Sequence, residues 1–397
     1  MTKAEAVPLG SVATITRKTI APERIQVGTA YVGLENIQRG GAIQGVQHIG
    51  PGDVGSTKFE FNDQQVLFGK LRPNLAKIAR PEFDGVCSTD ILAISPGPLL
   101  DKAYLAHYLS HPDIVALSTA RAAGVNLPRL SPTELAKFEL PLPPLEEQRR
   151  IAGILDRVDG LRAQRRESLV HLEDLNQSIF LDMFGTALNI LQRWPTKPLG
   201  ALLSFLTSGS RGWARHYAEE GALFLRIQNV GHDHLVLDDI AYVIPPDTAE
   251  ARRTLVEAGD VLLSITADLG RTAVVPAGLG QAFINQHLSL LRAPSIVPVY
   301  LSAFLSSPAG QRQVLGRNRQ GVKAGLNFDD VRSIVVAIPP IELQWEFAER
   351  RSCVERQTGA HRSHLAELDE LFNSVQARAF TASFEMIALG RLGGAGR

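Results

Sequence analysis

The sequence predicts an α+β protein with two strand-rich globular domains, each followed by a long helix, in a pseudo-twofold internal duplication. Three observations support this prediction. A long segment recurs, short apolar runs alternate with turn residues, and two long stretches have helical periodicity. We expect the two long helices to pair as an antiparallel coiled-coil spacer, because this arrangement relates equivalent surfaces of the two halves.

The chain contains part of its own sequence twice, at an offset of 196 residues. Residues 142–148, LPPLEEQ, return as residues 338–344, IPPIELQ, and the same offset relates Tyr104 to Tyr300. Two copies are too few for a solenoid, which needs at least three units to bury its faces. The repeat therefore indicates a tandem duplication of one large module.

The first globular domain is expected over residues 1–144. Its apolar runs lie between Gly, Pro and Asn residues, which is typical of short strands bounded by turns. These runs are residues 30–34, 65–69 and 91–94. Little helix is expected apart from residues 103–110 and 113–121. The prolines at 141, 143 and 144 stop regular structure, and Pro144 suits the N-terminal edge of a helix.

The first long spacer helix is expected over residues 145–184. A helix of this length measures roughly 60 Å at about 1.5 Å per residue. Its predicted seam steps by three and four residues with two polar interruptions: Ile151, Ile154, Val158, Leu161, Arg165, Ser168, Leu172, Leu175 and Ile179. Helices this long greatly exceed the usual length of about 11–12 residues, which favours pairing between them. The alternative is that each helix only caps its own domain.

The second half repeats this plan. Residues 185–340 should form the second globular domain, with strands near 223–227 and 261–265. The second long spacer helix is expected over residues 341–384, followed by a flexible tail at 385–397. The offset carries the seam to Phe347, Arg350, Val354, Gln357, His361, His364, Leu368, Leu371 and Val375, which is apolar at its ends and polar in its middle.

Composition excludes several classes of protein. Lys plus Arg and Asp plus Glu both number 41, so the chain lacks the global basic field common in nucleic-acid binders. A DNA-binding role would therefore need local basic clusters, or partners that supply phosphate contacts. Cys87 and Cys353 lie in different halves and form no disulfide framework. No signal peptide and no apolar run of about 18 residues is apparent, so we expect a cytoplasmic protein without membrane contact.

Catalytic motifs do not emerge from the sequence. Residues 50–57, GPGDVGST, have the glycine spacing of a phosphate loop but lack its lysine, so they indicate a turn. His232 and His234 could ligate a metal, but no third ligand lies nearby, and a polar loop is the better interpretation. Nucleophile elbows and methyltransferase motifs are also missing from the sequence. These observations indicate a binding module.

Basic and amide residues recur in turns at matching places of the two halves. Arg and Lys hold phosphates or read guanine edges, whereas Asn and Gln read adenine edges. Alternatively, Asn forms turns and surface Arg is simply solvated, but recurrence in both copies favours a DNA-binding face. The candidates in the first half are Lys70, Arg72, Asn74, Lys77, Arg121, Asn126 and Arg129. Those in the second half are Arg211, Arg215, Arg226, Gln228, Asn229, Arg271, Gln286, His287, Arg317, Arg319 and Lys323.

Four segments carry a resemblance to a known family. They are LPLPPLEEQRRIAGIL at 140–155, its weaker copy at 338–344, VLFGKLRP at 66–73 and GDVLLSIT at 259–266. Over essentially its full length the chain resembles the specificity subunit of a type I restriction–modification system. The resemblance implies that both globular domains are target-recognition domains, each of which reads half of a bipartite site on double-stranded DNA.

The same resemblance implies partners and the absence of an active site in this chain. The helices would dock two methyltransferase (modification) subunits, and restriction/translocase subunits would join them. S-adenosylmethionine, ATP and Mg²⁺ would bind to those partners, with no cofactor bound by this chain. The expected docking residues are Gln148, Ile151, Leu155, Leu172, Leu175, Ile179, Gln344, Phe347, Leu368 and Leu371.

Two other functions compete with this interpretation. One is a stand-alone DNA-binding protein with two domains, which would need a basic surface of its own. The other is a scaffold or carbohydrate-binding protein that does not bind DNA. Because the loops of the two domains differ, the family interpretation predicts an asymmetric DNA site.

Overall fold

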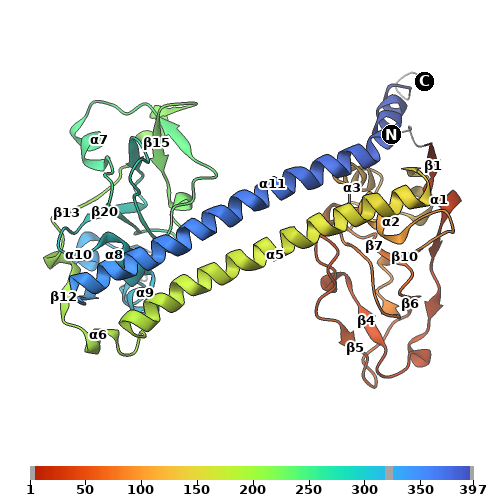
Figure 1. Ribbon diagram of the computed structural model, residues 1–397, viewed down its shortest axis with the longest axis horizontal. Coiled ribbons are helices and arrows are strands. Elements are labelled where there is room, and N and C mark those ends of the chain that lie inside the picture. The colour runs from red at the N-terminus through yellow and green to blue at the C-terminus, as the bar shows by residue number, and fades with distance from the viewer. Residues whose placement is uncertain (1–4, 318–324, 394–397) are drawn as a thin grey trace. The chain divides into compact units, whose positions relative to one another are not determined.

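The computed structural model describes residues 5–317 and 325–393, with side chains described up to residue 380. The chain has the predicted α+β fold and divides into two compact units. Unit 1 comprises residues 1–166 and 363–397, and unit 2 comprises residues 167–362. Each unit therefore combines one strand-rich segment with parts of both long helices (Figure 1).

The described residues of unit 1 form three sheets. The two-stranded sheet pairs β1 (Ala6–Pro8) with β11 (Glu139–Pro141). The four-stranded sheet has the order β2 (Ala13–Thr16), β10 (Ile91–Pro96), β7 (Val66–Gly69) and β8 (Ile78–Ala79). The five-stranded sheet has the order β3 (Thr19–Ile20), β6 (Lys58–Phe61), β9 (Gly85–Cys87), β4 (Ala30–Val32) and β5 (Gln47–His48). The short helices are α1 (Leu9–Val12), α2 (Lys102–Leu109), α3 (Pro112–Ala120) and α4 (Pro132–Leu135).

Unit 2 is built on the same plan. Its two-stranded sheet pairs β12 (Thr196–Pro198) with β21 (Val335–Ala337). One four-stranded sheet has the order β13 (Phe205–Ser208), β20 (Leu288–Arg292), β17 (Val261–Ser264) and β18 (Thr272–Val274). The other has the order β14 (Tyr217–Ala218), β16 (Ala241–Val243), β15 (Ala222–Leu225) and β19 (Ala282–Ile284). The short helices are α6 (Ile190–Arg193), α7 (Ala249–Thr254), α8 (Pro298–Ser306), α9 (Pro308–Gly316) and α10 (Phe328–Arg332).

The duplication is visible in individual contacts. The Tyr104 hydroxyl donates to the carbonyl oxygen of Pro141 at 2.9 Å, and the Tyr300 hydroxyl donates to that of Ala337 at 2.9 Å. Both tyrosines are fully buried. These bonds join α2 to β11 in unit 1 and α8 to β21 in unit 2, at the offset found in the sequence. The two globular segments thus share one fold, although the outer sheet of unit 1 has an additional strand.

Each unit has an equivalent four-stranded sheet, which contains β7 in unit 1 and β17 in unit 2. Both faces of this sheet are covered, because side chains alternate along a strand. In unit 1, Phe68 of β7 packs in the cluster that contains α2 and the long helices, whereas Leu67 packs toward the five-stranded sheet. In unit 2, Leu263 and Leu262 of β17 divide in the same way between two clusters. The turns that follow β7 and β17 therefore begin at a rigid, fully buried strand.

The two long helices are α5 (Leu145–Phe184) and α11 (Ile341–Gly393). Within each unit, segments of the two pack together and run antiparallel (Figure 1). Arg162 bonds to Asp369 at 2.5 Å in unit 1, and the Phe180 and Phe347 rings lie 5.6 Å apart in unit 2. Helix α11 continues beyond its predicted end at residue 384, to Gly393, and residues 394–397 lie outside the described residues.

The predicted seam is only half right. Every second predicted position is off by one residue. Leu155, Arg162 and Phe372 pack where the long helices meet in unit 1, instead of Ile154, Leu161 and Leu371. The last three are exposed. An α-helix has 3.6 residues per turn, so a strict seven-residue repeat drifts around it. Each long helix must also pack against its own globular segment. The contact positions are therefore set by the partner helix and the globular segment together.

Each long helix is fastened to its own domain by a buried glutamine. The Gln148 side chain accepts from the Asp101 backbone N–H at 2.9 Å and donates to the carbonyl oxygens of Leu99 and Pro143 at 2.9 and 2.8 Å. Gln344 accepts from the Val297 N–H at 2.9 Å and donates to the Pro339 carbonyl at 2.9 Å. The repeated Pro-Pro-x-Glu-x-Gln sequence is thus explained by this intramolecular anchor.

Charged contacts add a second anchor, which differs between the units. In unit 1, Asp156 of α5 binds Arg80 and His107, each at 2.7 Å. Burial disfavours the Asp156 carboxylate, but the bonds from these two residues outweigh burial and hold its pKa below the ordinary value. In unit 2, Arg351 of α11 binds Asp233, which Ser302 also contacts; burial raises the pKa of Asp233 to about 6 against the opposing effect of Arg351.

Replacing Gln148 or Gln344 with Ala should lower the free energy of unfolding by about 1–3 kcal/mol, because buried backbone groups lose their partners. Chemical denaturation followed by circular dichroism measures this effect. Gln177→Ala, an exposed change on the same α5 helix, is the control and should leave the transition unchanged. Wild-type stability of both anchor variants would contradict the assigned role.

Candidate nucleic-acid interface

In unit 1, two of the predicted DNA-binding loops lie side by side. The Arg72 backbone N–H donates to the Pro128 carbonyl at 2.8 Å, and the Leu130 N–H donates to the Lys70 carbonyl at 3.0 Å. The Lys70 N–H in turn donates to the carbonyl of Asp90, just before β10, at 2.9 Å. The structure thus brings together the turn at 70–77, the loop at 121–130 and the turn before β10. We call this group of three segments the first loop cluster.

Unit 2 has an equivalent group, the second loop cluster, around residues 265–267, 285–287 and 325–326. The Leu326 N–H donates to the Ile265 carbonyl at 2.9 Å, and the Ile265 N–H donates to the His287 carbonyl at 2.9 Å. Two of the predicted residues of this half, Arg319 and Lys323, lie outside the described residues.

Backbone strain occurs at the same place in both clusters. Arg72 has φ 50° and Ala267 has φ 64°, and each lies three residues after the last residue of the strand that precedes it, β7 or β17. The left-handed region is unfavourable for residues with a side chain, and such strain concentrates at functional sites. Its recurrence in two copies of the module makes these turns candidates for a functional site.

The polar side chains of the first loop cluster are exposed, bound in an ion pair or half-buried. Arg72, Asn74 and Asn126 are exposed, and among the described residues the Arg72 guanidinium has no acidic partner. Arg129 is bound by Asp90, and this bond raises the pKa of its guanidinium. Lys70 is half-buried.

Two other predicted residues of this half are tied to their own domain. Lys77 donates to the Leu34 carbonyl at 2.5 Å. Arg121 pairs with Glu134 at 3.3 Å and lies over the Phe138 ring. Their side chains are partly used in holding the loops, which the sequence did not indicate.

The second loop cluster differs in chemistry. His287 contacts Thr266 through Nδ1, and its Nε2 lies 3.0 Å from the Gln286 side-chain amide. Arg271 pairs with Asp268 at 2.5 Å, within the same turn. Arg317 donates to the Ser333 hydroxyl at 2.7 Å and to the Ser333 carbonyl at 2.8 Å, so it closes a helix end instead of extending toward a ligand.

The remaining predicted residues of the second half lie on segments that adjoin this cluster, because Asn285 forms a bridge with Ser210 and its N–H donates to the Leu225 carbonyl at 3.1 Å. Arg211 and Arg215 are exposed. Arg226 and Gln228 both bind Asp239, at 3.4 and 2.6 Å. Asn229 is buried and bonds to backbone groups on both sides of its loop, including the Arg226 N–H at 3.0 Å. Its prediction as a DNA-binding residue is corrected, since it stabilises the loop as Asn36 does in unit 1.

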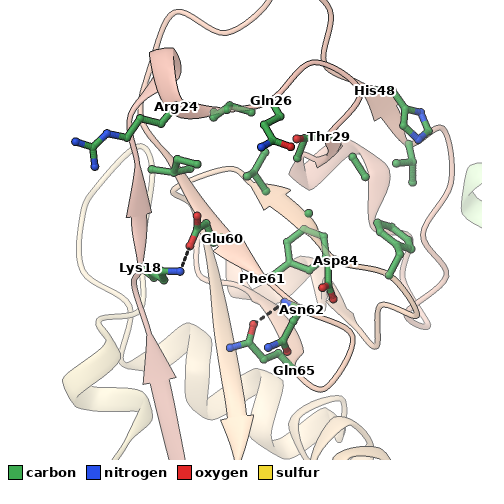
Figure 2. Close-up of a pocket in the computed structure, with 18 of the residues that line it drawn as sticks. Lys18, Arg24, Gln26, Thr29, His48, Glu60, Phe61, Asn62, Gln65 and Asp84 are labelled. Atoms are coloured by element: carbon green, nitrogen blue, oxygen red, sulfur yellow. Dashed lines mark hydrogen bonds and ion pairs between the residues drawn. The ribbon is translucent and has the colours of Figure 1, made fainter.

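A cavity of about 950 Å³, which the sequence did not predict, lies beside the five-stranded sheet of unit 1. Figure 2 shows Lys18 paired with Glu60, at 2.5 Å, on one wall, with Arg24, Gln26 and His48 around the rim. Its walls come from strands and loops far apart in the chain, so no local motif marks it. A larger groove of about 1790 Å³ lies between this domain and the unit 1 helices and includes Asn74.

The predicted docking residues fall into two groups. The buried group packs against its own domain, which corrects its assignment to a partner surface: Gln148, Ile151, Leu155, Gln344 and Phe347. Ile179 is half-buried against the unit 2 core. Leu172 and Leu368 are half-buried, whereas Leu175 and Leu371 are 44% and 48% exposed. Of the predicted docking residues, Leu175 and Leu371 expose the most apolar surface.

No helix in the described ranges is long and apolar enough to span a membrane. Within the same ranges, no three His, Cys, Asp or Glu side chains gather as a set that could hold a metal ion.

Comparisons with known proteins agree with these features. The family model for the type I restriction modification DNA specificity domain matches residues 2–171. The EcoKI specificity subunit of Escherichia coli K12 is 26% identical over 319 residues, which cover 72% of this chain and 66% of that relative. The chain thus spans just under two thirds of the length of this curated relative.

Solved structures share the fold. A structure from work on the assembly and conformational transition of a type I restriction–modification system has a TM-score of 0.57 at 23% identity and covers 96% of this chain and 98% of its own. The S subunit of a type I restriction–modification system from M. genitalium has a TM-score of 0.63 at 15% identity, and the match covers 96% of this chain and 97% of that subunit. These structures share the fold of this chain, and the family model and the curated relatives show that its sequence is similar to type I restriction–modification specificity subunits.

Proposed function

We propose that this chain is the non-catalytic DNA-reading subunit of a type I restriction–modification complex. Each unit would read one half of a bipartite, asymmetric site on double-stranded DNA. The observation that carries this proposal is the pair of equivalent loop clusters, which share a backbone arrangement and a strained turn but differ in side chains. Equivalent scaffolds with different side chains suit the reading of two different half-sequences.

The near-neutral charge fits a reader that works within an assembly. Sequence-independent affinity for DNA comes mainly from cations at phosphates, and this chain has equal numbers of acidic and basic residues. Partner subunits would therefore supply much of the phosphate contact. Two methyltransferase subunits would dock on the helices and restriction/translocase subunits would join them. S-adenosylmethionine, ATP and Mg²⁺ would act on those partners.

A chimera tests the two-reader proposal. Exchanging residues 197–338 for the corresponding segment of a relative should change one half of the methylated sequence and leave the other half unchanged, because that segment carries one loop cluster. Methylation mapping of genomic DNA from cells with the chimera measures the outcome. A change in both halves, or a wild-type site that is short and continuous, would show that the units are not independent readers.

Leu175 and Leu371 support two equivalent docking faces. They are related by the offset of 196 residues, one lies in each unit, and both are about half exposed on their helices. Monomeric proteins often expose single leucines, but recurrence at equivalent positions of a duplicated module suits two copies of one partner.

Replacing either leucine with Asp should remove one methyltransferase from the complex, and the double replacement should abolish assembly, because a charge is costly in an apolar interface. Sedimentation of the purified complex gives the stoichiometry. Gln177→Asp places the same charge at another exposed α5 position and should leave assembly intact. Full assembly of the double variant would refute docking at these residues.

Arg72 should contact phosphate, because its exposed guanidinium has no acidic partner among the described residues. Arg72→Ala should weaken binding to all DNA sequences alike and reduce the slope of log affinity against log salt by about one. Titrations of the assembled complex at several salt concentrations measure both quantities. An unchanged slope together with unchanged affinity would remove Arg72 from the interface.

A further inference from the structure

Arg129 and Asp90 form an ion pair on the exposed side of the first loop cluster. The Arg129 Nε donates to Asp90 Oδ1 at 2.8 Å, and an NH2 group donates to Oδ2 at 3.3 Å, so the guanidinium is held by both carboxylate oxygens. The side chains are 44% and 24% exposed, respectively. The pair is therefore fixed in orientation while part of the guanidinium remains open to solvent.

Asp90 is itself held in place. Its backbone N–H lies 3.3 Å from the Ser88 hydroxyl, and its carbonyl accepts from the Lys70 N–H at 2.9 Å. The Arg129 backbone exchanges hydrogen bonds with Ala123, which closes the loop that carries it. Both members of the pair thus rest on backbone that the sheet and the adjacent turns define.

We propose that Arg129 is a base-reading residue of the first unit, probing a guanine edge, and that Asp90 is its positioning residue. This inference rests on the proposed DNA-reading function. A guanidinium suits guanine O6 and N7, and holding it in one orientation reduces the entropy lost on binding. The adjacent carboxylate cancels its charge and repels phosphate, so the pair is poorly suited to a backbone contact.

Among the described residues of unit 2, no such pair occupies the equivalent place. His287 occupies the position of Asp90, since the Ile265 N–H donates to its carbonyl as the Lys70 N–H does to that of Asp90. The imidazole contacts Thr266 instead of an arginine, and Gly325 pairs with Thr266 where Arg129 pairs with Leu71. The effect of changing Arg129 should therefore be confined to one half of the DNA site.

The test uses the chain assembled with its methyltransferase and duplexes that carry the mapped site, with each base pair changed one at a time. Arg129→Ala should lose roughly 5- to 150-fold discrimination at one G·C pair in one half-sequence. Because Arg129→Ala leaves the Asp90 carboxylate without its partner, binding should also weaken for every duplex, so the ratio of affinities between duplexes is the quantity that tests base reading. Arg129→Lys keeps the charge but not the planar donor pair, and it should lose the same discrimination.

Asp90→Asn should raise the overall affinity for DNA, whereas a structural defect would lower it. Freeing the Arg129 charge should tighten binding to all sequences and steepen the salt slope by about one, while discrimination at the same base pair falls. Arg332→Ala is the matched control, because it removes an arginine from another exposed ion pair, with Asp329 at 3.0 Å. It should change neither quantity.

The outcomes separate this inference from the proposed function. If wild-type complex shows no sequence-specific binding, the proposed function fails. If the wild type is specific but the Arg129 variants keep full discrimination, or weaken all sequences alike with a smaller salt slope, base reading by Arg129 is overturned. Retained discrimination in Arg129→Lys alone would assign the Arg129→Ala defect to loop structure and would also overturn the inference.

Discussion

The buried glutamine at the start of each long helix is the contact on which the rest of each unit depends. Gln148 and Gln344 satisfy backbone groups of the globular segment and of the proline turn that leads into the helix. A lateral shift of the helix would leave those groups unpaired in the interior, which is costly. Each long helix is therefore part of the core of a unit, and its outward surface is whatever that packing leaves exposed.

This constraint determines which helix surface is available to a partner. Because Ile151 and Leu155 are committed to the unit 1 core, and Phe347 to the unit 2 core, the seam shifts by one residue at alternate positions. The shift exposes Leu175 and Leu371, which a regular two-stranded coil would bury. The proposed docking surface is thus a consequence of helix-to-domain packing.

The loop clusters depend on the same scaffold. They begin at β7 and β17, which are buried on both faces, and backbone hydrogen bonds hold neighbouring segments at equivalent positions. Function can then diverge through side chains alone. One unit has Arg129 paired with Asp90 and an Arg72 without an acidic partner among the described residues, whereas the other has a histidine–threonine contact. Because the two units share the backbone arrangement and differ in their side chains, one duplicated module can provide two different readers.

The sequence by itself determined the duplication, the order of strand-rich segments and long helices, the start of both helices and the resemblance to a known family. These features depend on signals confined to a few neighbouring residues, such as the proline turn, or on direct repetition. Tertiary structure alone decided the helix register, the inward role of Gln148, the structural role of Asn229 and the pairing of Arg129 with Asp90. Such contacts join residues distant in the chain, and a side chain's partner depends on how sheets and helices pack, which local periodicity does not specify.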